Sequence, residues 1–193
     1  MVVELRRGFK AEAERIALSV RSELNLTAID RLDPLQLAED LHIPVVTVNE
    51  LSQHGASERS IARLLTSDAG FCAGTVCAGT RHLIVYNPQH APGRRANSLA
   101  HELSHVILEH PARPALGEGG CRYWNGQLEA EADYMASTLL VPRAGLLAWL
   151  KQGGDPIDGP YHFGVSQALF QWRLNQTGVQ RQLPARAHKL APV

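Results

Sequence analysis

The chain has 193 residues and a formal net charge of zero at pH 7; 45% of its residues are hydrophobic and 20% are charged. This composition is typical of a globular protein. Because the net charge is zero, the protein surface as a whole has no positive field that would attract nucleic acid. The sequence has no apolar run long enough to span a membrane, no secretion signal and only three cysteines, so we expect a cytoplasmic protein without a disulfide framework.

In the first part of the chain, apolar spacing and helix-start residues predict short helices and strands. Apolar residues recur every three or four positions over residues 8–24, and charged residues fill the other face, which predicts a surface helix. Asp33 before Pro34 is typical of a helix start, and so is Ser57. The patterns together predict helices over 8–24, 34–41 and 57–65, a strand over 43–48, and a hairpin of strands over 70–76 and 81–86.

The helix predicted over 92–109 carries the pattern H-E-x-x-H, from His101 to His105. Residues four apart on a helix lie on one face, so both imidazoles can bind one metal ion. Glu102 is then placed to take a proton from a water molecule at that ion, which is the chemistry of metal-assisted peptide hydrolysis. A solvated helix face that happens to carry two histidines is the alternative interpretation.

A second predicted helix, which starts near Leu128 and is ended by Pro142, supplies further acidic residues. Glu129 and Asp133 are four residues apart and share a face. Glu129 would complete a His-His-Glu set with one position open for water, and Asp133 would accept the N–H of a ligand histidine. Glu131 lies about 200° around the helix from Glu129 and should point elsewhere. An ordinary charged helix face is the alternative for these acids.

These two helices resemble the ImmA/IrrE family of metallopeptidases. That family pairs an H-E-x-x-H helix with a helix of pattern E-x-x-A-N/D-x-F-A-x-x-L-L-x-P, and here Met135 stands where phenylalanine is usual. The pattern is filled by Glu129, Ala132, Asp133, Ala136, Leu139, Leu140 and Pro142. The similarity extends upstream to residues 7–10 and 32–34 and downstream to residues 163–166.

The resemblance implies a zinc-dependent endopeptidase that cuts a helix-turn-helix transcriptional repressor during a stress or mobile-element response. His101, His105 and Glu129 would hold Zn²⁺, with Mn²⁺ or Fe²⁺ also compatible, and Glu102 would be the catalytic base. We expect an α+β, zincin-like fold in which a small antiparallel or mixed sheet packs on the two metal-binding helices. Residues 1–150 would form the peptidase domain, and residues 151–193 a small helical extension with a flexible tail.

Some features of the catalytic site are left open by the sequence. Tyr123, His110 and His162 are each candidates to stabilise the oxyanion of the reaction, and the sequence does not choose among them. Tyr123 lies in a glycine-rich loop over 111–127 that we expect to be mobile beside the cleft. A strand of the predicted hairpin is a candidate to bind extended substrate backbone, although core packing explains it equally well.

The sequence is also compatible with two other functions. The metal site can be structural or vestigial, in a regulatory binding module without peptidase activity, but a structural site has no use for Glu102. A DNA-binding regulator would rest on the last predicted helix, which Ser166 caps and which runs to Leu174. Arg173 is the one cation in that helix, so we favour packing or partner docking over direct DNA binding.

Overall fold

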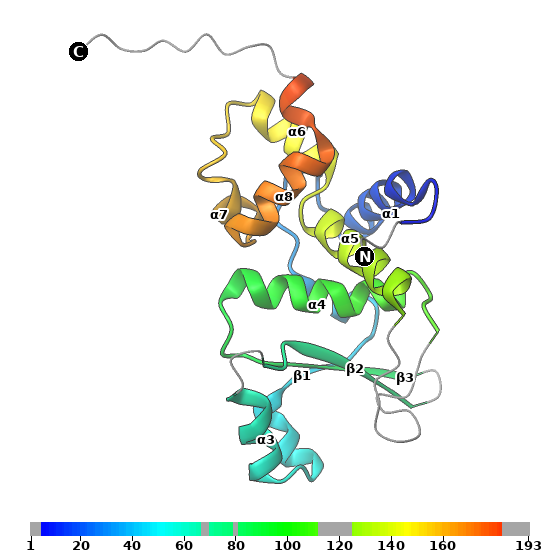
Figure 1. Cartoon of the computed structure of the whole chain (residues 1–193), viewed down its shortest axis with the longest axis vertical. Helices are drawn as coiled ribbons and strands as arrows, with labels where there is room; N and C mark the ends of the chain where they lie inside the picture. The colour runs from blue at the N-terminus through cyan, green and yellow to red at the C-terminus, as the bar shows by residue number, and fades with distance from the viewer. Residues whose placement is uncertain (1–4, 67–69, 79–80, 112–124, 183–193) are drawn as a thin grey trace, which may run out of the picture.

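The computed structural model describes residues 5–66, 70–78, 81–111 and 125–182. Within these ranges the predicted α+β fold is confirmed, with eight α-helices and a three-stranded mixed sheet (Figure 1). The α-helices are α1 (Phe9–Glu23), α2 (Pro34–Asp40), α3 (Glu58–Leu65), α4 (Pro92–Ile107), α5 (Gly126–Leu140), α6 (Arg143–Lys151), α7 (Gly159–Phe163) and α8 (Gln167–Thr177). The strands are β1 (Val45–Thr47), β2 (Ala73–Ala78) and β3 (Arg81–Tyr86), and two 3-10 helices are η1 (Val48–His54) and η2 (Val179–Gln182).

Helix starts follow the capping residues of the sequence. The side chains of Asp33, Ser57 and Ser166 accept hydrogen bonds from backbone N–H groups in the first turns of α2, α3 and α8. These N–H groups have no partner within their own helix, so each cap stabilises its helix by about 1 kcal/mol. Asn125 caps α5 in the same way, and this helix therefore begins slightly earlier than predicted.

The central strand of the sheet is β3, which β1 joins in parallel and β2 in antiparallel orientation. The predicted hairpin is therefore confirmed, with Thr75 opposite Ile84. β1 is shorter than the strand predicted over 43–48, because Thr47 and Glu50 form a capping box that starts η1. β2 lies at one edge of the sheet, and no described strand pairs with its outer side.

The helix α5 forms the centre of the molecule. α4 lies along one face of the sheet, α5 packs on α4, and α1 and α8 cover other sides of α5 (Figure 1). Small and apolar side chains allow this close packing, and those without exposed surface include Ala132, Met135, Ala136, Leu139 and Leu140. Phe163 and Phe170 of the C-terminal helices belong to the same hydrophobic cluster. The boundary predicted at residue 150 stays a prediction.

The C-terminal end of α5 is held by a buried arginine from α1. Charged residues of α1 are expected on its solvated face, but the side chain of Arg21 is buried, and it donates hydrogen bonds to the carbonyl oxygens of Leu139 (2.8 Å) and Leu140 (3.1 Å). It also donates to the carbonyl oxygens of Thr27 and Asp30. Burial lowers the pKa of Arg21 to about 10, so the guanidinium stays charged at neutral pH. The last carbonyls of a helix have no partner within it and carry partial negative charge, which explains why a cation is stable there.

Candidate metal centre

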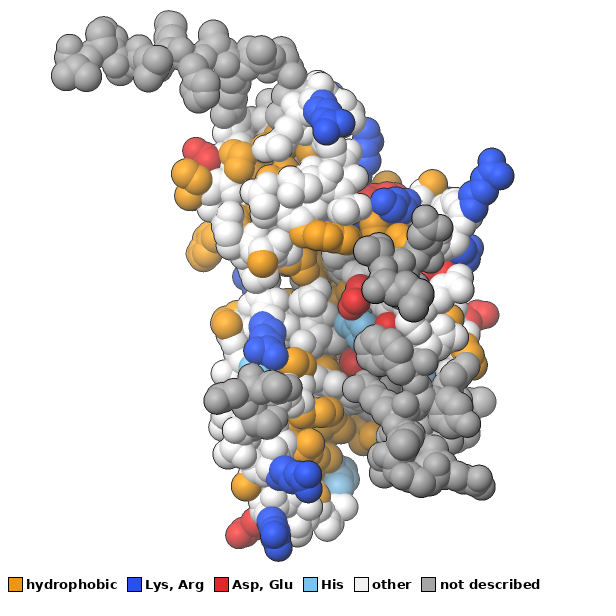
Figure 2. All heavy atoms as spheres, viewed as in Figure 1, with side chains coloured by type: hydrophobic (Ala, Val, Ile, Leu, Met, Phe, Trp, Pro, Cys, Tyr) orange, Lys and Arg blue, Asp and Glu red, His pale blue; other side chains and the backbone are white. Residues whose placement is uncertain are grey.

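Two helices bring three potential metal ligands together. His101 and His105 lie one turn apart on α4, and their Nε2 atoms are 3.1 Å from each other. Glu129, in the first turn of α5, places Oε2 at 3.3 Å from Nε2 of His101 and 3.7 Å from Nε2 of His105. The three side chains are partly exposed, and histidine and acidic side chains meet at the surface near the middle of Figure 2.

The triangle formed by these three atoms fits a single tetrahedral ion. Zinc bonds of 2.0–2.1 Å to nitrogen or oxygen put neighbouring ligand atoms about 3.3–3.4 Å apart. The observed separations of 3.1, 3.3 and 3.7 Å lie on both sides of that value. Three protein ligands also leave a fourth position free, as catalytic zinc sites require. The donor set of two imidazoles and a carboxylate suits zinc, and it is compatible with Mn²⁺ or Fe²⁺.

Asp133 is placed to orient His101. Its Oδ1 lies 2.8 Å from Nδ1 of His101, on the ring edge opposite Nε2. A proton on Nδ1 then leaves the lone pair of Nε2 free for a metal. Burial alone would lower the pKa of His101, but the hydrogen bond to Asp133 and the charges of Asp133, Glu102 and Glu129 together raise it above its usual value.

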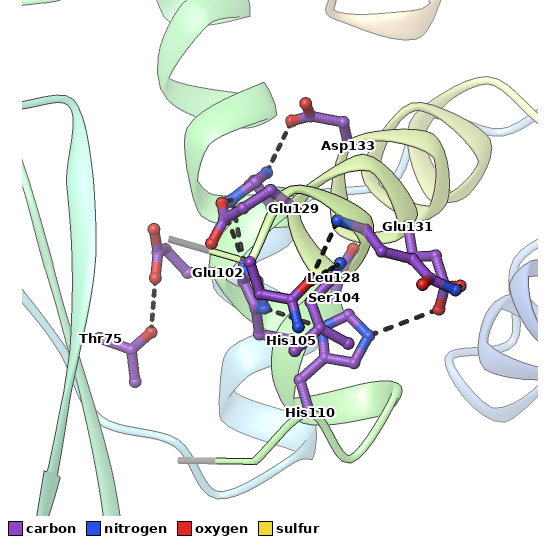
Figure 3. A network of polar contacts seen from close by, with 12 residues as sticks. Thr75, Glu102, Ser104, His105, His110, Leu128, Glu129, Glu131 and Asp133 are labelled. Carbon is purple, nitrogen blue, oxygen red and sulfur yellow. Dashed lines mark hydrogen bonds and ion pairs between the residues drawn. The ribbon is translucent and has the colours of Figure 1, made fainter. Parts of the chain in front are cut away.

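A different pair of side chains contacts His105. Nδ1 of His110 lies 2.9 Å from Nδ1 of His105, and Nε2 of His110 lies 3.8 Å from Oε2 of Glu131 (Figure 3). The side chains of His110 and Glu131 are only 7% and 6% exposed. Burial lowers the pKa of His110, and the charges of Glu131 and Glu129 offset this only in part. Glu131 thus points away from the three ligand atoms, as expected, but the sequence did not indicate its contact with His110.

The carboxylate of Glu102 is held by the sheet. Thr75 on β2 donates its hydroxyl hydrogen to Oε2 of Glu102 at 2.7 Å (Figure 3). Sequence reasoning missed Thr75, because only the packing of α4 on the hairpin brings the two residues together. Cys77 follows on the same face of β2, where burial and then the charge of Glu102 raise the pKa of its thiol. The thiol is therefore protonated at neutral pH.

The three oxyanion candidates differ in where they lie. Tyr123, like most of the loop over 111–127, is outside the described residues. His110 faces the ring of His105 through Nδ1, and His162 lies on α7 in another part of the molecule. There Nε2 of His162 is 3.0 Å from the carbonyl oxygen of Ile29, and its ring stacks on Trp149. The structure does not bring His162 to the three ligand atoms.

In the described part of the chain, no helix has both the length and the apolar character needed to cross a bilayer.

Comparisons with known proteins bear on this site. A comparison with curated proteins found no match. The family model Peptidase_M78, described as the IrrE N-terminal-like domain, matches residues 38–175, more than two thirds of the chain, and the match includes both metal-centre helices. The chain therefore belongs to the IrrE N-terminal-like peptidase family, and this membership supports a metallopeptidase-type function.

Proposed function

We propose that this protein is a zinc-dependent endopeptidase of the ImmA/IrrE type. The observation that carries the proposal is the triangle of His101, His105 and Glu129, with the carboxylate of Glu102 beside it. Zinc, when held there, supplies a Lewis acid that polarises the scissile carbonyl and eases the deprotonation of water.

Glu102 performs the proton transfers in this proposal. Because Thr75 occupies Oε2 of Glu102, the other carboxylate oxygen remains available to a water molecule. Glu102 takes a proton from the attacking water and delivers it to the amine nitrogen that leaves when the peptide bond breaks. Its position next to His101 on α4 places it beside the metal ligands without making it one of them.

The edge strand β2 supports a substrate with extended backbone. The outer edge of β2, which pairs with no strand among the described residues, offers N–H and C=O groups to a peptide that adds as a further strand. Thr75 joins this edge directly to Glu102, so a peptide bound along β2 would lie close to the proton-transfer group. A folded surface does not offer such a backbone, and we therefore propose that the substrate is cut in an exposed or locally unfolded segment.

We propose a helix-turn-helix transcriptional repressor as the protein substrate and the cytoplasm as the place of action. The substrate rests on the resemblance to the ImmA/IrrE family, and the place of action rests on the sequence, which has only three cysteines and no apolar run of membrane-spanning length. Direct DNA binding is not part of the proposal, because Arg173, the one cation of α8, is buried and pairs with Glu14 at 2.6 Å. The exposed side chains of α8 are all uncharged, so they would give few phosphate contacts.

The test is cleavage of a peptide library derived from a digested bacterial proteome, with new termini identified by mass spectrometry. Wild-type protein with zinc should create new termini, whereas the Glu102→Gln variant should create none. New termini that appear equally with both proteins would contradict the proposal. Absence of cleavage by zinc-loaded wild type, for this library and for a repressor encoded beside the gene, would favour a non-proteolytic binding module instead.

A further inference from the structure

We infer that His110 and Glu131 form a buried relay that positions His105 and strengthens its hold on the metal. This inference rests on the proposed metal site, but not on peptidase activity. His101 has its own partner, Asp133, so the two ligand histidines are oriented by different means.

The contact between His105 and His110 restricts where their protons can lie. Their Nδ1 atoms are 2.9 Å apart, so one of the two must donate and the other must accept. Nε2 of His105 faces the other two ligand atoms and must present a lone pair to bind a metal. A neutral His105 therefore carries its proton on Nδ1 and donates it to Nδ1 of His110. His110 in turn must carry its own proton on Nε2, the atom that faces Glu131.

The far end of this chain of contacts is a buried negative charge. Oε2 of Glu131 lies 3.8 Å from Nε2 of His110, which is an electrostatic contact and longer than an ideal hydrogen bond. Arg6 and Gln127 hold the carboxylate, each with a donor nitrogen 3.4 Å from an oxygen of Glu131. Asp133, by comparison, has a side chain 71% exposed, so solvent screens its charge far more than that of Glu131.

The end of α4 delivers His110 to this position. The backbone N–H of His110 donates to the carbonyl of His105 at 2.9 Å, and that of Glu109 donates to the carbonyl of Val106 at 3.0 Å. This pair of bonds closes the helix as a Schellman motif, in which the residue before the last donor is left-handed. Glu109 has a φ of 52°, a conformation that glycine adopts more readily. The turn folds the chain back so that the ring of His110 meets the ring of His105.

The experiment measures zinc affinity by competition with a chromophoric chelator, without any substrate. Glu131→Gln removes the buried charge and keeps the shape, and His110→Phe removes the acceptor and keeps a ring. Each should weaken zinc binding by about 10- to 100-fold. His110→Asn, whose amide oxygen can accept from Nδ1 of His105, should recover part of the loss. Glu109→Gln removes an exposed carboxylate next to His110 and is the matched control, with unchanged affinity expected.

The double variant of Glu131→Gln with His110→Phe separates a relay from a general effect of charge. If Glu131 acts through His110, the double variant should bind zinc no more weakly than His110→Phe alone. If the losses of zinc affinity in the two single variants multiply in the double variant, Glu131 acts on the metal directly through space, and the relay is overturned. Unchanged affinity in both single variants would also overturn it.

Folding and activity are followed separately so that the outcomes stay distinct. Far-ultraviolet circular dichroism shows whether each variant folds. If His110→Phe does not fold, Glu131→Gln compared with Glu109→Gln decides the question, because both remove one charge without changing shape. The visible spectrum of the Co²⁺-loaded protein should change in Glu131→Gln, since it reports ligand geometry. Loss of zinc affinity in these variants, together with a wild type that binds zinc but cuts no peptide, would support the relay while contradicting the proposed function.

Discussion

Thr75 on the edge strand β2 donates a hydrogen bond of 2.7 Å to Glu102, the carboxylate beside the three candidate metal ligands. The strand proposed to bind the substrate backbone and the carboxylate proposed to transfer protons are therefore in direct contact. This contact orients one oxygen of Glu102 and makes the position of the carboxylate depend on the packing of α4 against the sheet.

Replacement of Thr75 tests this contact. Thr75→Val keeps the shape of the side chain and removes the hydroxyl donor. A hydrogen bond to a charged group contributes about 1.5–3 kcal/mol, so kcat should fall by about 10- to 100-fold. Zinc content should not change, because Thr75 touches none of the ligand atoms. Thr75→Ser restores the donor and should recover most of kcat; if it were as slow as Thr75→Val, the loss would have another cause than the hydrogen bond.

The pH dependence of zinc binding follows from the contacts of His101. Asp133 is the main cause that raises the pKa of His101 above its usual 6.5, against the effect of burial. Zinc needs Nε2 of His101 without a proton, so zinc affinity should fall as the pH drops through this raised pKa. Asp133→Asn removes a raising charge, and the fall should then move to lower pH. Chelator competition across a pH series measures both curves, and superimposable curves would contradict this role of Asp133.

The raised pKa of His101 also affects the folding stability of the metal-free protein. Zinc affinity should rise with pH, whereas this contribution to stability should fall with pH. A pKa of His101 that is higher in the folded than in the unfolded state contributes stability to the metal-free fold below the unfolded pKa. That contribution is lost as the pH rises through the folded pKa. Urea unfolding of chelator-treated protein should therefore show a smaller loss of stability between mildly acidic and neutral pH in Asp133→Asn than in wild type.

The buried guanidinium of Arg21 should matter for stability rather than for chemistry. Arg21→Met leaves the carbonyl oxygens of Leu139 and Leu140 without their donor, so the free energy of unfolding should fall by about 3–5 kcal/mol. Arg21→Lys keeps a positive charge and should lose less. Urea denaturation measures the difference. Equal losses in the two variants would show that charge at the end of α5 contributes little.

The cluster of candidate metal ligands was predictable because their spacing is local. His101 and His105 lie one turn apart on one helix, and Glu129 and Asp133 do so on the next, so helical periodicity alone pairs them. Thr75 is different, since its contact with Glu102 depends on how the hairpin packs against α4. No periodicity in the sequence carries that information.

The partners of His105 were not predictable for a related reason. Glu131 points away from the candidate ligand Glu129, as helical geometry indicates, but His110 lies beside it. His110 reaches that place through a left-handed turn at Glu109, where a glycine would have been the recognisable signal. The burial of Arg21 was not predictable from periodicity either, because two of its carbonyl partners, Leu139 and Leu140, lie on a helix far away in sequence.

The central claim is that His101, His105 and Glu129 hold one zinc ion and that Glu102, beside them, takes the proton from the attacking water. The most direct test is the zinc content of purified wild type, Glu102→Gln and His101→Ala, together with cleavage of a candidate repressor by each. We predict about one zinc per chain in wild type and in Glu102→Gln, loss of zinc in His101→Ala, and cleavage by wild type only. Zinc retained by His101→Ala, or cleavage by Glu102→Gln at the wild-type rate, would contradict the claim.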